Sequence, residues 1–323
     1  MDYQKVKKIL KKIKLSAPKI LVVGDVMLDQ YVLGKVKRIS PEAPVPILDF
    51  KSQEAVLGGA GNVAHNLINL GAEVSLATII GKDLDGQSII DLLLNLEISS
   101  ELIFVSSSIK TTKKTRFMAQ GNHLLRLDND SKGFLTTDFD LFKKRIIEEI
   151  NNFDCIIISD YNKGVCKESV IQEVINKANR KNIPTYIDPK GSQWKKYLNA
   201  TGLTPNIKEV EEQLNLKLKI DSDFENVAKI IKERFKLKFC LITRGADGMT
   251  YFGRDKIIHQ KVGKKEVFDV SGAGDTVIAS LAASISSKIG IEDSIAISGN
   301  LSSEVVTHIG TIPFHINMFK SND

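Results

Sequence analysis

The sequence predicts an α/β fold in which helices cover both faces of a mostly parallel central sheet. Apolar, strand-like runs alternate with helix-like stretches through most of the 323 residues, the pattern that consecutive βαβ units produce. Several runs are apolar at every position, as expected for strands buried on both faces. One core can grow to about 250–300 residues before a chain splits into domains. We therefore expect a single domain over residues 1–323.

The first strand is expected at residues 20–23, where a fully apolar run ends in Gly24 and Asp25. Further runs with an apolar body are strand candidates, at 74–80, 155–159, 185–188 and 239–243. Several of them end in Asp, Ser or Thr before a turn. Ligands of parallel sheets bind beyond the carboxyl ends of the strands, so we expect binding groups there.

Two segments break this rhythm and predict a small β lid. Residues 30–50 contain three prolines and no helical period, and residues 104–128 alternate in places and carry several cations. Both are typical of extended chain outside the main sheet. We expect them to pair as a flap over its edge, within the same domain.

Composition points away from nucleic-acid and membrane partners. The net charge of +6 is spread along the chain, and the densest basic run, residues 7–14, has apolar residues at helical spacing, as in the solvated face of a first helix. The three cysteines show no metal spacing. No run resembles a signal peptide or reaches the about 20 apolar residues that span a bilayer. We expect a cytoplasmic protein.

The strongest functional motif is a glycine turn, residues 268–276, between a strand and a helix that is expected to start at Asp275 and Thr276. Gly272 and Gly274 would let backbone N–H groups point into one space, where the helix start adds positive charge. Such a site suits a transferring phosphoryl group, and a carboxylate there can accept the proton of an attacking hydroxyl. Alternatively, Asp275 only caps the helix.

A second glycine turn, residues 57–62, leads into a helix expected over 62–70. Residues 59–64 formally fit the dinucleotide pattern G-x-G-x-x-[GA], but the preceding segment is short and half polar. The alternative is a turn at Gly59 that approaches a polyol, with Asn62 bonding its hydroxyls. No Walker A motif occurs in the sequence, so a kinase here must hold ATP in another way.

Two further motifs each allow a functional and a structural interpretation when only their residue types are considered. Asn206 and Glu209 share one face of a helix start, where they could order a hydrated Mg²⁺ or form a capping box. Thr243, Arg244 and Gly245 follow an apolar strand and could meet a phosphate, although an ordinary polar turn explains them equally well.

Together these motifs resemble a known family. Residues 58–62, GGAGN, and 269–275, DVSGAGD, are similar to the two signatures of the ribokinase-like, or PfkB, carbohydrate kinases, in the right order and separation. Asn206-x-x-Glu209 is similar to the family's magnesium motif. The resemblance implies a ribokinase-like fold and an ATP- and Mg²⁺-dependent sugar kinase, and it favours function over capping at Asp275 and Asn206.

The bacterial heptose-7-phosphate kinase branch gives the nearest resemblance. It rests on motifs along the chain from about Lys19 onward: GDVMLDQY at 24–31, RISPEAPVP at 38–46, KTR at 114–116, LRLD at 125–128, SDY at 159–161 with KG at 163–164, and IDPKG at 187–191. It implies phosphorylation of D-glycero-β-D-manno-heptose 7-phosphate at C1, a step towards ADP-heptose for lipopolysaccharide core.

The resemblance also implies roles for individual residues. Asp275 would be the base, and the N–H groups of Gly272, Ala273 and Gly274 would hold the developing charge. Residues expected at the sugar and its phosphate are Asp29, Gly59, Asn62, Arg38, Lys114, Arg116, Arg126, Lys163, Asp188 and Lys190. Residues expected at the nucleotide are Asn206, Glu209, Thr243, Arg244, Gly245, Gly272, Gly274 and Asn300, with Mg²⁺ held through water by Asn206 and Glu209.

Four points of the resemblance remain to be tested. His65-Asn66 follows the first signature where relatives often carry other residues. The stretch 308–311 lacks the last histidine of the H-x-G-H motif found in a nucleotidyltransferase domain that some relatives carry, so we expect a stand-alone kinase. Family members often form homodimers through the lid. A kinase for a fructose or tagatose phosphate or ribose, or a non-catalytic nucleotide-sugar sensor, remains an alternative.

Overall fold

The computed structural model describes residues 1–254, 256–263, 265–308 and 310–318. Its centre is a nine-stranded sheet in the order β13-β12-β11-β10-β9-β8-β1-β4-β5. These strands are β1 (Lys19–Gly24), β4 (Glu73–Gly81), β5 (Ile103–Ser106), β8 (Cys155–Ser159), β9 (Thr185–Asp188), β10 (Gly202–Leu203), β11 (Phe239–Thr243), β12 (Met249–Gly253) and β13 (Lys256–Gln260). The pairs from β5 to β11 are parallel, and β12 and β13 are antiparallel. The mostly parallel sheet is confirmed.

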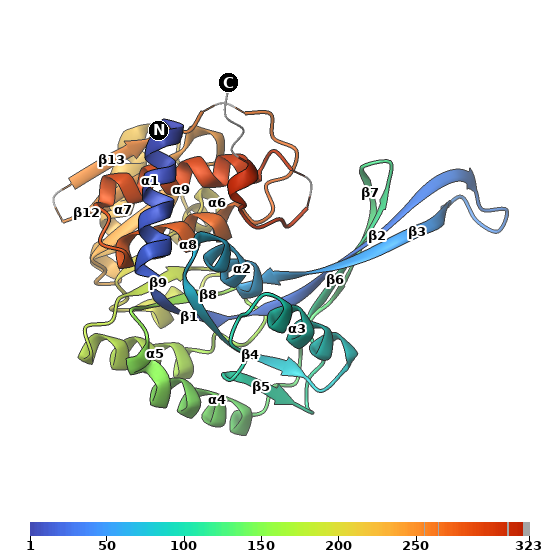
Figure 1. Ribbon diagram of the computed structural model, residues 1–323, viewed down its shortest axis with the longest axis horizontal. Helices are drawn as coiled ribbons and strands as arrows, with labels where there is room; N and C mark the ends of the chain where they lie inside the picture. The colour runs from blue at the N-terminus through green and yellow to red at the C-terminus, as the bar shows by residue number, and fades with distance from the viewer. Residues whose placement is uncertain (255, 264, 309, 319–323) are drawn as a thin grey trace.

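Helices lie on both sides of this sheet (Figure 1). One core contains α1 (Tyr3–Ser16), α2 (Ala60–Leu70), α3 (Leu84–Asn95), α8 (Ala273–Ser286) and α9 (Ile291–Val305). The other contains α4 (Thr136–Glu149), α5 (Glu168–Arg180), α6 (Ile207–Leu214) and α7 (Asp221–Arg234). In β1, Ile20 and Val22 belong to the first core and Leu21 to the second, because successive side chains of a strand point to opposite faces.

The basic first helix, α1, packs its apolar side inward. Val6, Ile9 and Ile13 are buried, and the lysines between them are exposed. The expected solvated face is therefore confirmed. Within the described ranges, no helix combines the length and the apolarity needed to cross a bilayer.

The lid is a separate four-stranded sheet in the order β3-β2-β6-β7 that projects from the body (Figure 1). Its strands are β2 (Val26–Ile39), β3 (Pro46–Gly59), β6 (Lys113–Ala119) and β7 (Asn122–Asn129). The segment expected over 104–128 needs one correction. Its first residues form β5, which pairs with β4 in the central sheet, because Ile103 is buried in the core.

The strand order reverses next to β1, which places the ligand crevice. From β1 the chain runs to β4 and β5 on one side of the sheet, and later to β8 and the strands beyond it on the other. A crevice forms outside the carboxyl ends of strands at such a switch point. Asp25 follows β1, Asp160 follows β8 and Asp188 ends β9, so their carboxylates lie at this end of the sheet.

Candidate active site

Asp275 lies in the first turn of α8 and is only 2% exposed. Its carboxylate accepts a 2.7 Å hydrogen bond from Asn62 Nδ2 on one oxygen and a 2.6 Å bond from the Tyr161 hydroxyl on the other. The helix starts at Ala273, two residues earlier than expected, and its N-cap is Gly272. Asp275 is therefore not the helix cap. Its carboxylate instead bonds with Asn62 and Tyr161.

The environment of Asp275 tunes its acidity. Burial raises the pKa of Asp275 to about 6, against the hydrogen bonds from Tyr161 and Asn62, which lower it. The charge of Asp29 raises this pKa further, and that of Lys114 lowers it. A base works best when its pKa lies near the working pH, so this carboxylate is suited to accept a hydroxyl proton.

The glycine turn before α8 leaves room for an anion beside Asp275. Gly272 has a φ of 81°, and a Cβ there would come within 2.9 Å of Asn62 Nδ2. A Cβ on Gly274 would meet no atom closer than Asp188 Oδ2, at 3.9 Å. The Ala273 N–H already donates to the Val270 carbonyl at 3.3 Å. Gly272 and Gly274 thus offer better donors than Ala273, which the sequence grouped with them.

Asn62 is held in place from α2. Asn66, one turn further on, donates to the Asn62 carbonyl at 2.8 Å, and its own Oδ1 accepts bonds from Thr276 and from the Phe314 backbone. Asn66 is one of the two residues at which this chain differs from many relatives. Its side chain thus joins α2 to α8 and to the C-terminal segment. Burial lowers the pKa of neighbouring His65 to about 4, so this imidazole is neutral at pH 7.

The dinucleotide interpretation of the first glycine turn is wrong. Gly59 ends β3, an antiparallel strand of the lid, and not a strand of the parallel sheet. A dinucleotide fingerprint requires the glycines to follow a strand of a βαβ unit. Here the left-handed φ of 59° at Gly59 instead turns the chain from the lid into α2.

The base of the lid contributes an acid and two cations. Asp29 is 3% exposed and accepts bonds from Arg116 Nη1 at 2.7 Å and from Thr311 Oγ1 at 3.2 Å. Lys114 lies beside Asp29 in the register of the neighbouring strands β2 and β6. Its ammonium forms no salt bridge with any described residue. Burial lowers the pKa of Lys114, partly offset by Asp29. Of the predicted cations, this ammonium is the one that the crevice leaves available.

The other predicted cations are mostly engaged. Salt bridges join Arg126 to Asp128, Lys163 to Asp130, and Lys190 to Glu209. Arg116 and Arg126 also line a cavity of about 370 Å³ between the lid and the glycine loop, together with His123, Leu124, Leu125, Asp269 and Ser271.

Arg38 does not join the site of its own chain. It is exposed on β2, nine residues beyond Asp29, which corresponds to roughly 30 Å of strand. Its expected contact with the sugar phosphate is therefore not formed within one chain.

On the far side of the glycine turn, Asn206 and Glu209 form a capping box. Asn206 Oδ1 accepts from the Glu209 N–H at 3.0 Å, and Glu209 Oε2 accepts from the Asn206 N–H at 2.9 Å. The capping interpretation thus describes their contacts. Burial and then the charges of Glu209 and Asp275 raise the pKa of Asp188 well above its usual range. Such crowded carboxylates fit a divalent cation, which would relieve their repulsion.

The remaining residues expected at the nucleotide have other partners. Arg244 forms a 2.7 Å salt bridge with Asp221 and lies 4.1 Å over the ring of Phe224, so this guanidinium does not face the glycine turn. Thr243 Oγ1 donates to the Pro205 carbonyl at 3.5 Å. Gly245 has an open Cα with no atom near an added Cβ. Asn300 donates to the Ala296 carbonyl within α9.

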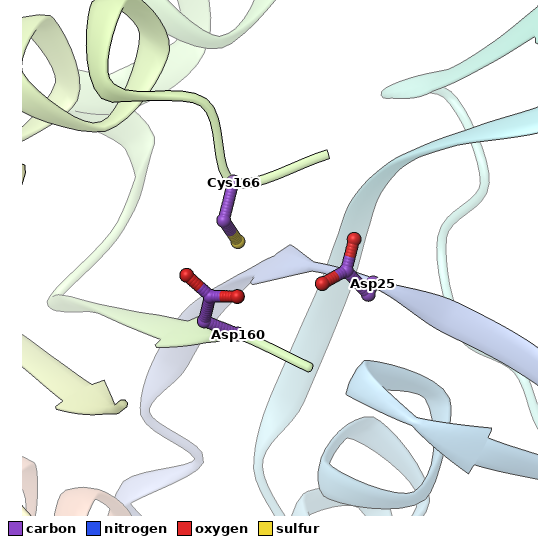
Figure 2. A group of neighbouring side chains, drawn as sticks. All are labelled: Asp25, Asp160 and Cys166. Atoms are coloured by element: carbon purple, nitrogen blue, oxygen red, sulfur yellow. The ribbon is translucent and has the colours of Figure 1, made fainter. Parts of the chain in front are cut away.

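A buried cluster lies beneath the crevice, where Asp25, Asp160 and Cys166 point toward one another (Figure 2). Asp160 pairs with the Lys196 ammonium and accepts a 2.6 Å bond from the Tyr197 hydroxyl. Burial raises the pKa of Cys166 well above its usual range, so the thiol stays protonated. Lys196 pairs with Asp160, and Asp25 accepts backbone N–H bonds from Tyr161, Lys163 and Val165, so the cluster holds the β8–α5 loop.

Sequence reasoning did not assign three residues that the structure brings to the site. Tyr161 and Thr311 contact Asp275 and Asp29, and Asp25 accepts three backbone N–H bonds from the loop that carries Tyr161. Asp25 and Tyr161 follow the carboxyl ends of β1 and β8, which is the available signal for them. Thr311 ends the stretch 308–311, whose partial likeness to the H-x-G-H motif gives no sign of a contact with Asp29.

Comparison with known proteins matches this architecture. The chain is 38% identical over 309 residues to "Bifunctional protein HldE" of Sulfurimonas denitrificans and 42% identical over 293 residues to the protein of that name from Campylobacter concisus. These matches cover 95% and 91% of this chain, but only 65% and 62% of the relatives. The chain thus spans somewhat under two thirds of the length of these curated relatives.

Solved structures show the same fold. Phosphofructokinase-2 from Escherichia coli, in complex with potassium, superposes with a TM-score of 0.79 at 18% identity, over 93% of this chain and 96% of that one. A putative ribokinase from Agrobacterium tumefaciens gives 0.74 at 17% identity, over 94% and 96%. The model of the pfkB family of carbohydrate kinases matches residues 17–317. The chain therefore belongs to the pfkB family of carbohydrate kinases, enzymes that use ATP and a divalent metal.

Proposed function

We propose that this enzyme phosphorylates D-glycero-β-D-manno-heptose 7-phosphate at its anomeric hydroxyl, giving the 1,7-bisphosphate. The observation that carries the reaction type is the buried Asp275 beside an open glycine turn, oriented by Asn62 and Tyr161. The choice of sugar rests on the motifs shared with the heptose-7-phosphate kinase branch and on relatives named HldE. In a pathway, the product would serve ADP-heptose synthesis for lipopolysaccharide core, in the cytoplasm where ATP is available.

In the proposed reaction, Asp275 accepts the proton of the C1 hydroxyl while that oxygen attacks the γ-phosphorus of ATP. A bond forms between the C1 oxygen and the γ-phosphorus as the bond between the γ-phosphorus and the bridging oxygen breaks, and ADP leaves with that electron pair. The N–H groups of Gly272 and Gly274, with the α8 N-terminus, stabilise the charge that develops. Positioning and electrostatics supply most of the rate in such transfers.

A divalent metal would be Mg²⁺, with Asn206 and Glu209 acting through its bound waters. When bound, it would neutralise phosphate charge on ATP. Glu209 keeps Oε1 toward Lys190 and Oε2 toward the Asn206 N–H, and each carboxylate oxygen can accept a further bond from water. The capping box therefore orients the same carboxylate that this role requires.

The sugar would lie between Asn62 and the lid base, with Asp29 accepting bonds from its hydroxyls. Its 7-phosphate would enter the cavity lined by Arg116 and Arg126, because arginine binds phosphate in a bidentate manner. Lys114 would serve the same anion or the transferring phosphoryl group. Arg126 would exchange its partner Asp128 for the phosphate.

We also propose that two copies pair through their lids. Every residue of β7 is exposed, and Leu125 and Leu127 are 62% and 59% exposed. An apolar, unpaired sheet face of this kind is normally covered. Pairing would also bring Arg38 of one lid towards the other copy. Sedimentation of the wild type against Leu125→Glu would test this, with a monomeric wild type as the contrary result.

The reaction is tested by ADP release with Mg-ATP on heptose 7-phosphate, fructose 6-phosphate, tagatose 6-phosphate and ribose. We expect turnover on the heptose phosphate and a loss of about 10²–10⁴-fold in Asp275→Asn, the usual worth of a general base. Preference for another sugar would keep the base and remove the heptose assignment. No turnover on any of them, with ATP still bound, would favour the sensor.

A further inference from the structure

The hydroxyl of Tyr161 is the second donor to the base. It donates a 2.6 Å bond to Asp275 Oδ1, while Asn62 Nδ2 donates to Oδ2. The burial of Tyr161 and the charge of Asp275 raise the pKa of Tyr161 well above its usual range. The phenol therefore keeps its proton at neutral pH and acts only as a donor to this carboxylate.

Tyr161 is fixed by its own backbone. The Asp25 carboxylate accepts bonds from the N–H groups of Tyr161, Lys163 and Val165 at 2.9, 3.0 and 2.9 Å. Asp160, the residue before Tyr161, accepts a 2.7 Å hydrogen bond from the Asn162 N–H. Figure 2 shows Asp25 and Asp160 converging from the ends of two adjacent strands. The loop that presents the phenol is thus tied to the switch point of the sheet.

Donors on both oxygens restrict the carboxylate to one orientation. Asn62 comes from α2 and Tyr161 from the β8–α5 loop, on different elements. With one bond on each oxygen, rotation about the Cβ–Cγ bond of Asp275 would break both. Each oxygen still has a lone pair with which to accept a proton.

We propose that Tyr161 is a positioning residue for the base, and that its hydroxyl holds the Asp275 carboxylate in the proton-accepting orientation and in its charged form. This inference rests on the proposed role of Asp275. It adds a residue outside both glycine signatures, on a loop that the sheet itself anchors.

The charged groups around Asp275 set the direction of the expected effect. Asp29 on β2 and Asp188 on β9 oppose the charge of Asp275, and Lys114 on β6 supports it. The bonds from Tyr161 and Asn62 lower the pKa of Asp275 from the value that burial alone would give. Removing the phenol hydroxyl therefore raises this pKa, and a larger fraction of the base is protonated at a given pH below neutrality.

The test is the pH dependence of kcat/KM for Tyr161→Phe, with wild type, Asp275→Asn and Tyr197→Phe measured alongside. Tyr197 is a matched control because its buried hydroxyl also donates a 2.6 Å bond to an aspartate, Asp160. We expect the acidic limb, near pH 6 in the wild type, to move up by about one pH unit in Tyr161→Phe, the worth of one bond to a charged group. In Tyr197→Phe it should stay in place.

The outcomes separate the two proposals. An unmoved limb in Tyr161→Phe, with Asp275→Asn inactive, would overturn the positioning role and leave the base intact. Full activity in Asp275→Asn would instead overturn the base. If Tyr161→Phe does not fold, 3-fluorotyrosine at position 161 gives the opposite test. Its more acidic phenol donates more strongly and should move the limb to lower pH, and an unmoved limb would again overturn the role.

Discussion

The two sheets of this protein differ in what surrounds them. Every strand residue of β8 is buried, whereas every residue of β7 in the lid is exposed. The central sheet is covered by helices on both faces, and the lid projects from the body with no helix over β7 (Figure 1). The first arrangement stabilises the fold, and the second leaves Leu125 and Leu127 of β7 exposed.

The site forms where the two sheets meet. Asp275, Asn62 and Tyr161 come from elements of the body, while Asp29 and Lys114 come from the first residues of lid strands. The proposed base and its two hydrogen-bond donors thus come from the body, and the proposed sugar contacts come from the lid. One body can in this way serve different sugars through changes in the lid.

The largest expected difference between the two sheets is in stability. Leu241 in β11 is fully buried and Leu125 in β7 is 62% exposed. Leu241→Ala should lower the free energy of unfolding by about 2–5 kcal/mol because it leaves a cavity. Leu125→Ala should change it by no more than about 0.5 kcal/mol, as is usual for surface positions. Urea unfolding at low protein concentration measures both.

This comparison also bears on the proposed lid dimer. Repeating the unfolding of Leu125→Ala at high protein concentration asks whether another chain covers β7. A loss that appears only at high concentration supports pairing through the lid, because association stabilises the folded state by mass action. A large loss at every concentration would contradict the exposure of Leu125 within one chain.

The central sheet was predictable because burial on both faces leaves a local signal. The apolar runs at 20–23, 155–159 and 239–243 fall within β1, β8 and β11. The two-residue β10 carries too few residues for any period, and the exposed β13 lacks an apolar run. The same reason explains why the sequence predicts residues 104–106 in the lid: the residues around them alternate, and only the pairing with β4 assigns them to the central sheet.

The site was predictable only where a motif contains it. The glycine turns pointed to Asp275 and Asn62, which meet although 213 positions separate them. Tyr161 belongs to the SDY motif shared with the heptose-7-phosphate kinase branch, but that motif gave it no role. Thr311 had no signal, because a single polar residue in a loop has many uses. The sequence also could not predict which way a cationic side chain points. Arg244 follows a strand like a phosphate ligand, but its contacts with Asp221 and Phe224 are tertiary.

A second prediction concerns adjacent lysines on the lid strand β6. Lys114 faces Asp29 and the crevice, whereas Lys113 forms a 2.8 Å salt bridge with Asp85. Lys114→Met should lower kcat/KM by about 10–100-fold, the worth of one charge-assisted hydrogen bond to phosphate. Lys113→Met should change it little. Steady-state kinetics on the sugar phosphate compare the two.

The lysine pair is a strict control because both changes remove one positive charge from the same strand. Equal losses would show that only the general field of the lid matters. A loss confined to Lys113→Met would reverse the assignment of the strand faces. Raised KM with unchanged kcat would place the Lys114 ammonium on the sugar's own phosphate, and lowered kcat would place it on the group in transfer.

The smallest expected effect is on the body side, at the proposed magnesium residues. Glu209→Gln keeps the capping box, since glutamine serves that position as well as glutamate, but it removes the charge beside Lys190. The Mg²⁺ concentration for half-maximal activity should rise roughly five-fold, as for the loss of about 1 kcal/mol in one interaction.

Glu212→Gln is the control, because Glu212 is exposed on the same helix and the change removes an equal charge. A shift in Glu209→Gln alone would support an outer-shell role, because the fold and the net charge are matched. Equal shifts in both would leave Glu209 with its part in the capping box alone.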